Sequence, residues 1–232
     1  MTITTVGLDA DDTLWHNETV FRLTQARFLD LLTDHDNAKI EARLAEIERR
    51  NLRLYGYGVK GFTLSMIETA MEMCGGDPPP GVLREILAAG REMLAHPVET
   101  HPGGDEARAR LSERYRLVLV TKGDLLYQAR KRAASGLGDL FAAVEIVSEK
   151  DRTTYERVFA RHGSGADKAV MAGNSMKSDV LPALEAGAFA VHIPYAVTWA
   201  HELADAPEAH PRYGALDSIT ALPDWIDRRS GG

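Results

Sequence analysis

Two acids and a threonine stand at the spacing Asp-x-Asp-x-Thr near the start of the chain. Asp9, Asp11 and Thr13 directly follow the apolar residues 6–8. Because aspartate is uncommon in strands and costly near a core, acids at this point need a cation or another partner. Alternate carboxylates at the end of a buried strand can hold one Mg²⁺, with Asp9 left to attack an electrophile and Asp11 to move a proton. The alternative is a loop in which an aspartate caps the following helix.

A hydroxyl group ends a second apolar stretch, residues 117–120. Thr121 is followed by Lys122 and Gly123. A hydroxyl together with free backbone N–H groups at a strand-to-helix turn binds phosphate oxygens well, so these three residues are candidates for substrate binding. The alternative is that Thr121 only caps the helix that begins near Leu125.

Two more polar groups follow later apolar stretches. Lys150 comes after residues 144–147 and can neutralise charge on an aspartyl nucleophile and a phosphoryl group, although a single lysine is usually a surface residue. Asp179 follows residues 169–172 and a Gly173-Asn174 turn, and is a third carboxylate unless it only interacts with a helix dipole. Four strands that each end in such a group favour Mg²⁺-assisted phosphoryl transfer.

The composition limits the classes of partner. The chain has 232 residues, of which 44% are hydrophobic and 26% charged, and a net charge of −7. Without a basic patch, this charge argues against a nucleic-acid partner. The sequence contains no leader-like segment and no apolar run of transmembrane length, so we expect a cytoplasmic protein that does not bind membranes. The single cysteine, Cys74, excludes an intramolecular disulfide.

Strands alternating with helices predict an α/β fold with a doubly wound parallel sheet. The predicted strands are apolar and rich in β-branched residues, and cover 3–8, 117–120, 144–147, 169–172 and 190–193. The predicted helices between them cover 106–114, 125–134, 154–162 and 180–186. We assign residues 1–15 and 98–232 to this catalytic core.

The stretch between the first acids and Thr121 is much longer than one crossover connection requires. Apolar residues at three- and four-residue spacing predict helices at 20–32, 38–54, 62–73 and 82–94. Clusters of glycine, proline and aspartate separate these segments. Residues 16–97 are therefore predicted to form an inserted α-helical cap domain.

The polar motifs, in this order, resemble those of the haloacid dehalogenase-like (HAD) hydrolase superfamily over nearly the whole chain. Residues 9–13 resemble the first motif, Thr121 the second, Lys150 the third, and residues 173–179 the fourth. The helical insertion is similar to the first cap class of the superfamily. The resemblance implies a HAD-like Rossmannoid core that carries this cap.

The resemblance also implies residue roles. Asp9 is the expected nucleophile and Asp11 the general acid and base, with Thr121 and Lys150 on the phosphate. Mg²⁺ is expected to be held by Asp9, the backbone carbonyl of Asp11, and Asp179. Many members have an acid where this chain has Asn174; an amide can ligate through its oxygen or bind a metal-bound water, but it removes one negative charge. Asn174 is therefore a metal-site residue, and we expect weaker metal affinity.

The second acid, Asp11, bears on the reaction type. Dehalogenases of the superfamily lack it because a halide leaving group needs no proton, whereas an alkoxide does. We therefore expect a Mg²⁺-dependent phosphatase that hydrolyses a small-molecule phosphate ester through an aspartyl-phosphate. A phosphomutase with the same motifs is the main alternative. A 2-haloacid dehalogenase and a non-catalytic phospho-accepting protein are the others.

Overall fold

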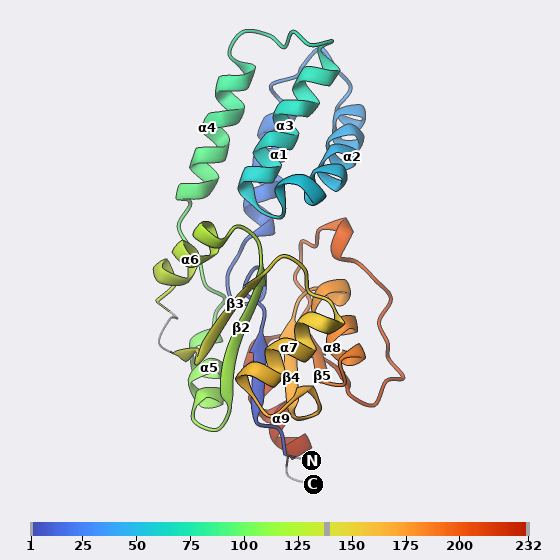
Figure 1. Ribbon diagram of the computed structural model, residues 1–232. Helices are drawn as coiled ribbons and strands as arrows, with labels where there is room; N and C mark the ends of the chain where they lie inside the picture. The colour runs from blue at the N-terminus through green and yellow to red at the C-terminus, as the bar shows by residue number, and fades with distance from the viewer. Residues whose placement is uncertain (1, 137–139, 231–232) are drawn as a thin grey trace. The chain divides into compact units, whose positions relative to one another are not determined.

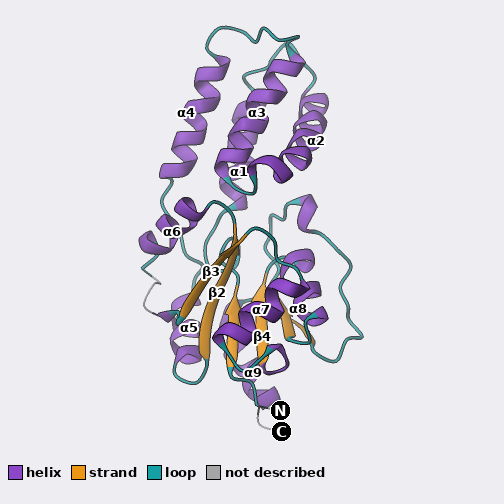
Figure 2. Ribbon diagram, viewed as in Figure 1, coloured by secondary structure: helices purple, strands orange, loops and turns teal. Residues whose placement is uncertain are grey.

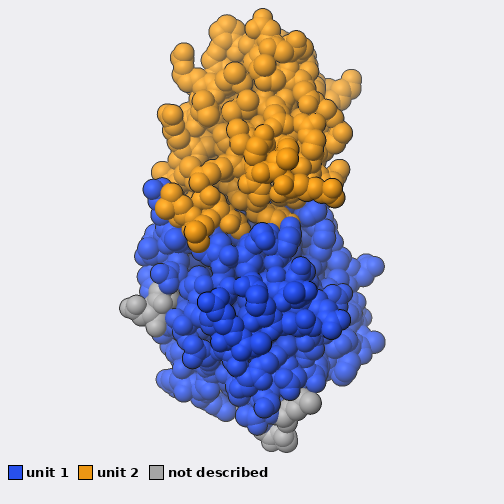
Figure 3. All heavy atoms as spheres, viewed as in Figure 1, with its two compact units in different colours: residues 1–18, 98–122, 128–232 blue, residues 19–97, 123–127 orange. Residues whose placement is uncertain are grey.

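The computed structural model describes residues 2–136 and 140–230, which contain a parallel sheet flanked by helices and a further group of helices (Figures 1 and 2). The chain divides into two compact units (Figure 3). Unit 1 contains residues 1–18, 98–122 and 128–232, and unit 2 contains residues 19–97 and 123–127. Among the described residues, no helix combines the length and the apolar character needed to cross a bilayer.

Six parallel strands form one sheet within the described residues, in the order β3-β2-β1-β4-β5-β6. The strands are β1 (Thr5–Leu8), β2 (Arg116–Lys122), β3 (Ala143–Val147), β4 (Ala169–Gly173), β5 (Phe189–His192) and β6 (Tyr213–Ala215). Strand β1 lies in the middle, and its Val6 is paired with Leu117 of β2 and Val170 of β4. The predicted α/β fold class is confirmed. The carboxyl ends of β1, β2 and β4 therefore meet at one edge, where ligands bind in such sheets.

Both faces of the sheet are buried, as a parallel sheet requires. Along β2, Leu117 and Leu119 pack in one hydrophobic cluster, and Val118 and Val120 in another. The first cluster includes residues of α5 (Gly104–Ser112) and α9 (Leu222–Ser230). The second includes residues of α7 (Arg152–His162) and α8 (Leu181–Glu185). Packing on both faces fixes the strands, so the residues at their ends have little freedom to move.

Strand β6 and helix α9 were not predicted from the sequence. The strand has only three residues, with Gly214 in the middle. A Cβ atom added at Gly214 would lie 2.5 Å from Nε1 of Trp225, so the glycine lets α9 pack directly on the strand. A short strand interrupted by glycine carries almost no period-two hydrophobic pattern, which is why the sequence did not reveal it.

Unit 2 has its own helical core. Its helices are α1 (Glu18–Leu29), α2 (Asn37–Tyr55), α3 (Val59–Met73) and α4 (Val82–Ala95), with Glu18 itself in unit 1. Helix α2 begins after Asp36, whose carboxylate accepts a hydrogen bond from the Ala38 N–H at 2.8 Å. Buried residues of all four helices pack together, including Phe28, Leu44, Phe62 and Ile86.

Candidate active site

Asp9 directly follows β1 and is 5% exposed. Its backbone N–H donates to the carbonyl of Ala172 at 3.0 Å, which continues the pairing of β1 with β4. Oδ2 of Asp9 accepts a hydrogen bond from the hydroxyl of Thr13 at 3.0 Å. Oδ1 accepts one from the ammonium of Lys150. The carboxylate is thus held by a donor at each oxygen.

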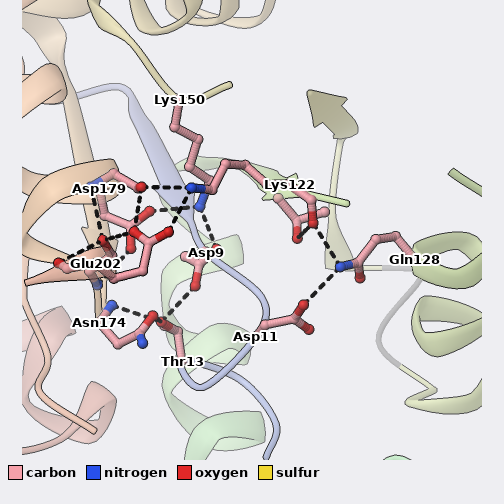
Figure 4. A network of polar contacts seen from close by, with 12 residues as sticks. Asp9, Asp11, Thr13, Lys122, Gln128, Lys150, Asn174, Asp179 and Glu202 are labelled. Atoms are coloured by element: carbon pink, nitrogen blue, oxygen red, sulfur yellow. Dashed lines mark hydrogen bonds and ion pairs between the residues drawn. The ribbon is translucent and has the colours of Figure 1, made fainter. Parts of the chain in front are cut away.

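Lys150 lies between two carboxylates (Figure 4). Its Nζ contacts Asp9 and is 2.6 Å from Oδ1 of Asp179, and its side chain is 2% exposed. Burial by itself lowers the pKa of Lys150, but the charges of Asp179 and Asp9 outweigh it and raise the pKa. Burial and the charge of Asp179 raise the pKa of Asp9. Two buried carboxylates share one ammonium, so this edge favours a further cation.

A π-helical turn, Met176–Val180, carries Asp179 to this position. Such turns occur often at functional sites. Oδ2 of Asp179 accepts from the N–H of Ser175 at 2.9 Å, and the hydroxyl of Ser175 accepts from the N–H of Ser178 at 2.9 Å. A Cβ atom added at Gly173 would lie 2.3 Å from Oδ2 of Asp179. Glycine at the end of β4 is therefore what allows the carboxylate to approach the sheet edge.

Asn174 faces three oxygen atoms of the first acid motif. One end of its side-chain amide lies 3.1 Å from the carbonyl oxygen of Asp11, 3.1 Å from Oδ2 of Asp9 and 3.2 Å from Oγ1 of Thr13. When the amide nitrogen is at this end, it donates to all three. When the amide oxygen is at this end, its distances to the three oxygens match the spacing of roughly 3 Å between adjacent ligands around octahedral Mg²⁺, whose metal–oxygen distance is about 2.1 Å. The donor set therefore fits Mg²⁺.

The ligands available to Mg²⁺ are not all charged. In residues 2–136 and 140–230, no group of three or more His, Cys, Asp or Glu side chains is arranged to hold a metal ion. The residues that would hold Mg²⁺ are Asp9 and Asp179, with neutral oxygens from the Asp11 backbone and the Asn174 amide. Hard oxygen ligands suit this cation. Weaker metal affinity, expected because Asn174 stands in place of an acid, stays a prediction.

The side chain of Asp11 points away from Asp9, whereas its carbonyl faces Asn174 (Figure 4). Oδ1 accepts from Nε1 of Trp15 at 2.6 Å and from the ammonium of Lys131. Oδ2 accepts from Nε2 of Gln128 at 2.8 Å. Gln128 and Lys131 belong to α6 (Leu125–Ala134), to which the sequence analysis assigned no chemistry.

Strand β2 brings Thr121 and Lys122 to the same edge of the sheet. Thr121 is 2% exposed, and its hydroxyl donates to the carbonyl of Lys122 at 3.3 Å. The ammonium of Lys122 lies 2.8 Å from Oγ of Ser178 and 2.8 Å from Oε1 of Glu202. Gly123 has φ of 131°, a conformation that favours glycine, and it is grouped with unit 2.

Glu202 also contributes to this edge, although nothing in the sequence pattern singled it out (Figure 4). It ends a short 3₁₀ helix, Ala200–Glu202, and its Oε2 accepts from the hydroxyls of Ser175 and Ser178. Burial alone raises its pKa, but the charge of Lys122 and these hydrogen bonds prevail and lower the pKa of Glu202 to about 2. The carboxylate is therefore ionised and firmly bound at neutral pH.

Comparisons with known proteins identify the family. No protein-family model matches the sequence, and a search of curated proteins gives no match. Among solved structures, a haloacid dehalogenase-like family hydrolase from Xanthomonas campestris is 39% identical, with a TM-score of 0.88. The similarity covers 99% of this chain and 94% of that one. The chain belongs to the haloacid dehalogenase-like hydrolase family, as its motifs indicated.

More distant structures share the fold. A HAD-hydrolase from Bacillus subtilis bound to magnesium has 16% identity and a TM-score of 0.68, over 98% of this chain and all of that one. L-2-haloacid dehalogenase from Xanthobacter autotrophicus with chloropropionic acid covalently bound has 16% identity and a TM-score of 0.64. That match covers 97% of this chain and 98% of the dehalogenase. At this identity the likeness concerns the fold alone, so the reaction must be argued from the residues of the site.

Proposed function

We propose that the protein is a Mg²⁺-dependent phosphomonoester hydrolase that acts on a small phosphorylated metabolite through an aspartyl-phosphate on Asp9. The observation that carries the proposal is the pairing of two acids with different surroundings. Asp9 is buried and accepts a hydrogen bond from Lys150. The carboxylate of Asp11 accepts hydrogen bonds from other side chains, namely Trp15, Gln128 and Lys131. A nucleophile and a separate proton carrier are the two groups that hydrolysis of a phosphate ester needs.

The first half of the reaction transfers the phosphoryl group to the protein. A carboxylate oxygen of Asp9 attacks phosphorus, and the bond from phosphorus to the ester oxygen breaks. Asp11, in its protonated form, gives its proton to the departing oxygen, so that an alcohol leaves. The Asp9 carboxylate and the phosphoryl oxygens are both negative and repel each other. The ammonium of Lys150, which contacts Asp9, reduces this repulsion.

The second half releases inorganic phosphate. Asp11, now ionised, takes a proton from water, whose oxygen attacks phosphorus, and the bond to Asp9 breaks. Asp9 is recovered as a carboxylate and Asp11 as an acid, so the cycle closes. Asp9, the Asp11 carbonyl, Asn174 and Asp179 would hold Mg²⁺, which would supply positive charge beside the phosphoryl oxygens when bound.

In this reaction Asp11 is the residue that distinguishes the chain from a dehalogenase of the same fold. Displacement of halide from carbon requires a nucleophile but no proton for the leaving group, so Asp11 would have no task there. A phosphomutase needs both acids and differs only in keeping water from the aspartyl-phosphate. It is therefore the closer competitor.

The test is phosphate release from a panel of phosphomonoesters with and without Mg²⁺. We expect release from at least one class of ester, loss of release with EDTA, and no chloride from 2-chloropropionate. Asp9→Asn keeps the size of the side chain and removes the nucleophile, so it should abolish release while the thermal unfolding transition remains. Isomerisation of a hexose phosphate without release would favour the mutase, and turnover by Asp9→Asn would exclude Asp9 as nucleophile.

A further inference from the structure

Helix α6 supplies two buried polar side chains that meet the carboxylate of Asp11. Lys131 and Gln128 are 6% and 4% exposed, and both lie in unit 1. The ammonium of Lys131 contacts Oδ1 of Asp11 and is 2.9 Å from Oδ1 of Asn17. Lysine is rarely buried without a charged partner, so the burial of Lys131 depends on Asp11.

Gln128 is held in one orientation. Its Nε2 donates both to Oδ2 of Asp11 at 2.8 Å and to the carbonyl of Lys122 at 2.9 Å. Turning the amide over would place its oxygen against two acceptors. Its Oε1 has no hydrogen-bond partner among the described residues. A buried oxygen without a hydrogen-bond partner lowers stability. This cost accompanies an orientation in which the two amide hydrogens point to Asp11 and to the carbonyl at the end of β2.

Trp15 completes the arrangement from the loop of Asp11 itself. Its side chain is 1% exposed, and its Nε1 is 2.6 Å from Oδ1 of Asp11. The ammonium of Lys131 lies 5.9 Å from the centre of the Trp15 ring. Three donors on three side chains fix the carboxylate at both oxygens, whereas a surface aspartate with a single partner would rotate freely.

We propose that Lys131 and Gln128 are positioning residues that hold the Asp11 carboxylate in place for proton transfer to the leaving group and, in the second half of the reaction, from water. The inference rests on the proposed function and adds two residues that lie outside the four motifs. Its consequence is specific: loss of either contact should impair the proton transfer, but not the attack by Asp9. The damage should therefore depend on how much the leaving group needs a proton.

The test compares kcat/KM for a series of aryl phosphates that runs from phenyl phosphate to 2,4-dinitrophenyl phosphate. The phenoxide of the first is a poor leaving group without a proton, and that of the second leaves readily. We expect Lys131→Met to lower kcat/KM about 100-fold for phenyl phosphate and less than about threefold for 2,4-dinitrophenyl phosphate. Lys131→Arg, which keeps a cation near Asp11, should recover at least about tenfold of the loss on phenyl phosphate.

A charge-matched control lies on the same helix. Arg130 is exposed, so Arg130→Met removes one positive charge from α6 without touching the network, and it should leave both rates unchanged. Gln128→Leu gives a second test should Lys131→Met not fold. Equal losses across the ester series, for whichever variant folds, overturn the inference and leave the proposed function standing. Absence of phosphate release by the wild-type protein with Mg²⁺ overturns both.

Discussion

Replacing Asn174 by aspartate restores the acid that many members of the family carry, and the loss of stability that it causes should become smaller when Mg²⁺ is added. In the native chain the amide nitrogen can donate to the Asp11 carbonyl, to Thr13 and to Asp9. An aspartate cannot donate to any of them. Without Mg²⁺ the variant therefore places a third carboxylate beside Asp9 and Asp179, with Lys150 as their shared cation.

The size of the effect follows from the distance. The amide end of Asn174 is 3.1 Å from Oδ2 of Asp9. Two unit charges at that separation repel by roughly 5 kcal/mol at an effective dielectric constant of about 20. Rotation or protonation of the new acid relieves part of this, so we expect a loss of about 2–3 kcal/mol without metal, or a Tm lower by about 5–10 °C. With Mg²⁺, an added charge at the cluster should tighten binding at least about tenfold, or about 1.4 kcal/mol.

The assay is thermal unfolding of both proteins in EDTA and across a Mg²⁺ titration, with calorimetry for the Kd. Asn174→Asp should melt below the wild type in EDTA and gain more from Mg²⁺. Asn37→Asp is the control, because Asn37 is an exposed residue of unit 2 at the start of α2, so the substitution adds the same charge at a residue that is not part of the candidate metal cluster. Equal melting in EDTA together with an unchanged Kd would refute the placement of Asn174 at the metal cluster.

Three further substitutions test charged residues, two of the candidate site and one of helix α2. Lys150→Met leaves Asp9 and Asp179 without their shared ammonium. Without metal the free energy of unfolding should fall by about 3 kcal/mol in denaturant titrations, and phosphate release should fall at least about 1,000-fold. An unchanged denaturation midpoint would contradict the buried ion pairs. The pKa of Glu202 is lowered to about 2, so the contribution of Glu202 to stability is present above pH 4.5 and is lost as pH falls from 4.5 toward 2. Glu202→Gln should therefore reduce the fall of Tm over that interval. Parallel Tm curves for the variant and the wild type would contradict the lowered pKa. Partial burial raises the pKa of Glu48 in α2 to about 7, so the wild type loses stability as pH rises from 4.5 to 7. Glu48→Gln should raise stability by about 1–2 kcal/mol at pH 8 and leave it unchanged at pH 4. Equal stability of the two proteins at pH 8 would argue against the raised pKa.

From the sequence we could predict which residues lie at the carboxyl ends of the strands, but not which side chains surround them. Asp9, Lys150 and Asp179 could be found because each follows an apolar stretch that had to be a buried strand, and parallel strands bring their ends together. The structure does bring these three side chains into contact. Their roles, and those of Thr121 and Lys122, stay predictions.

Other residues of the site could not be predicted from residue types and their spacing in the sequence. Lys131 and Gln128 read as ordinary polar residues of an amphipathic helix, because burial of a lysine depends on a partner far away in sequence. Glu202 lies in a connection with little regular structure, where spacing carries no information about what a side chain will meet. That the Asp11 side chain points away from Asp9 could not be predicted from the sequence either, because spacing does not fix a side chain's direction.

Glu202 lies in the segment that connects β5 with β6, and its contacts with Lys122, Ser175 and Ser178 hold this segment against the carboxyl edge of the sheet. Loops of this kind accept changes in length and composition more readily than strands do. A relative that keeps all four motifs but lacks this acid would leave the Lys122 ammonium and the two hydroxyls without this carboxylate. Proteins with identical motifs can thus carry either a neutral ion pair or a net positive charge at this point.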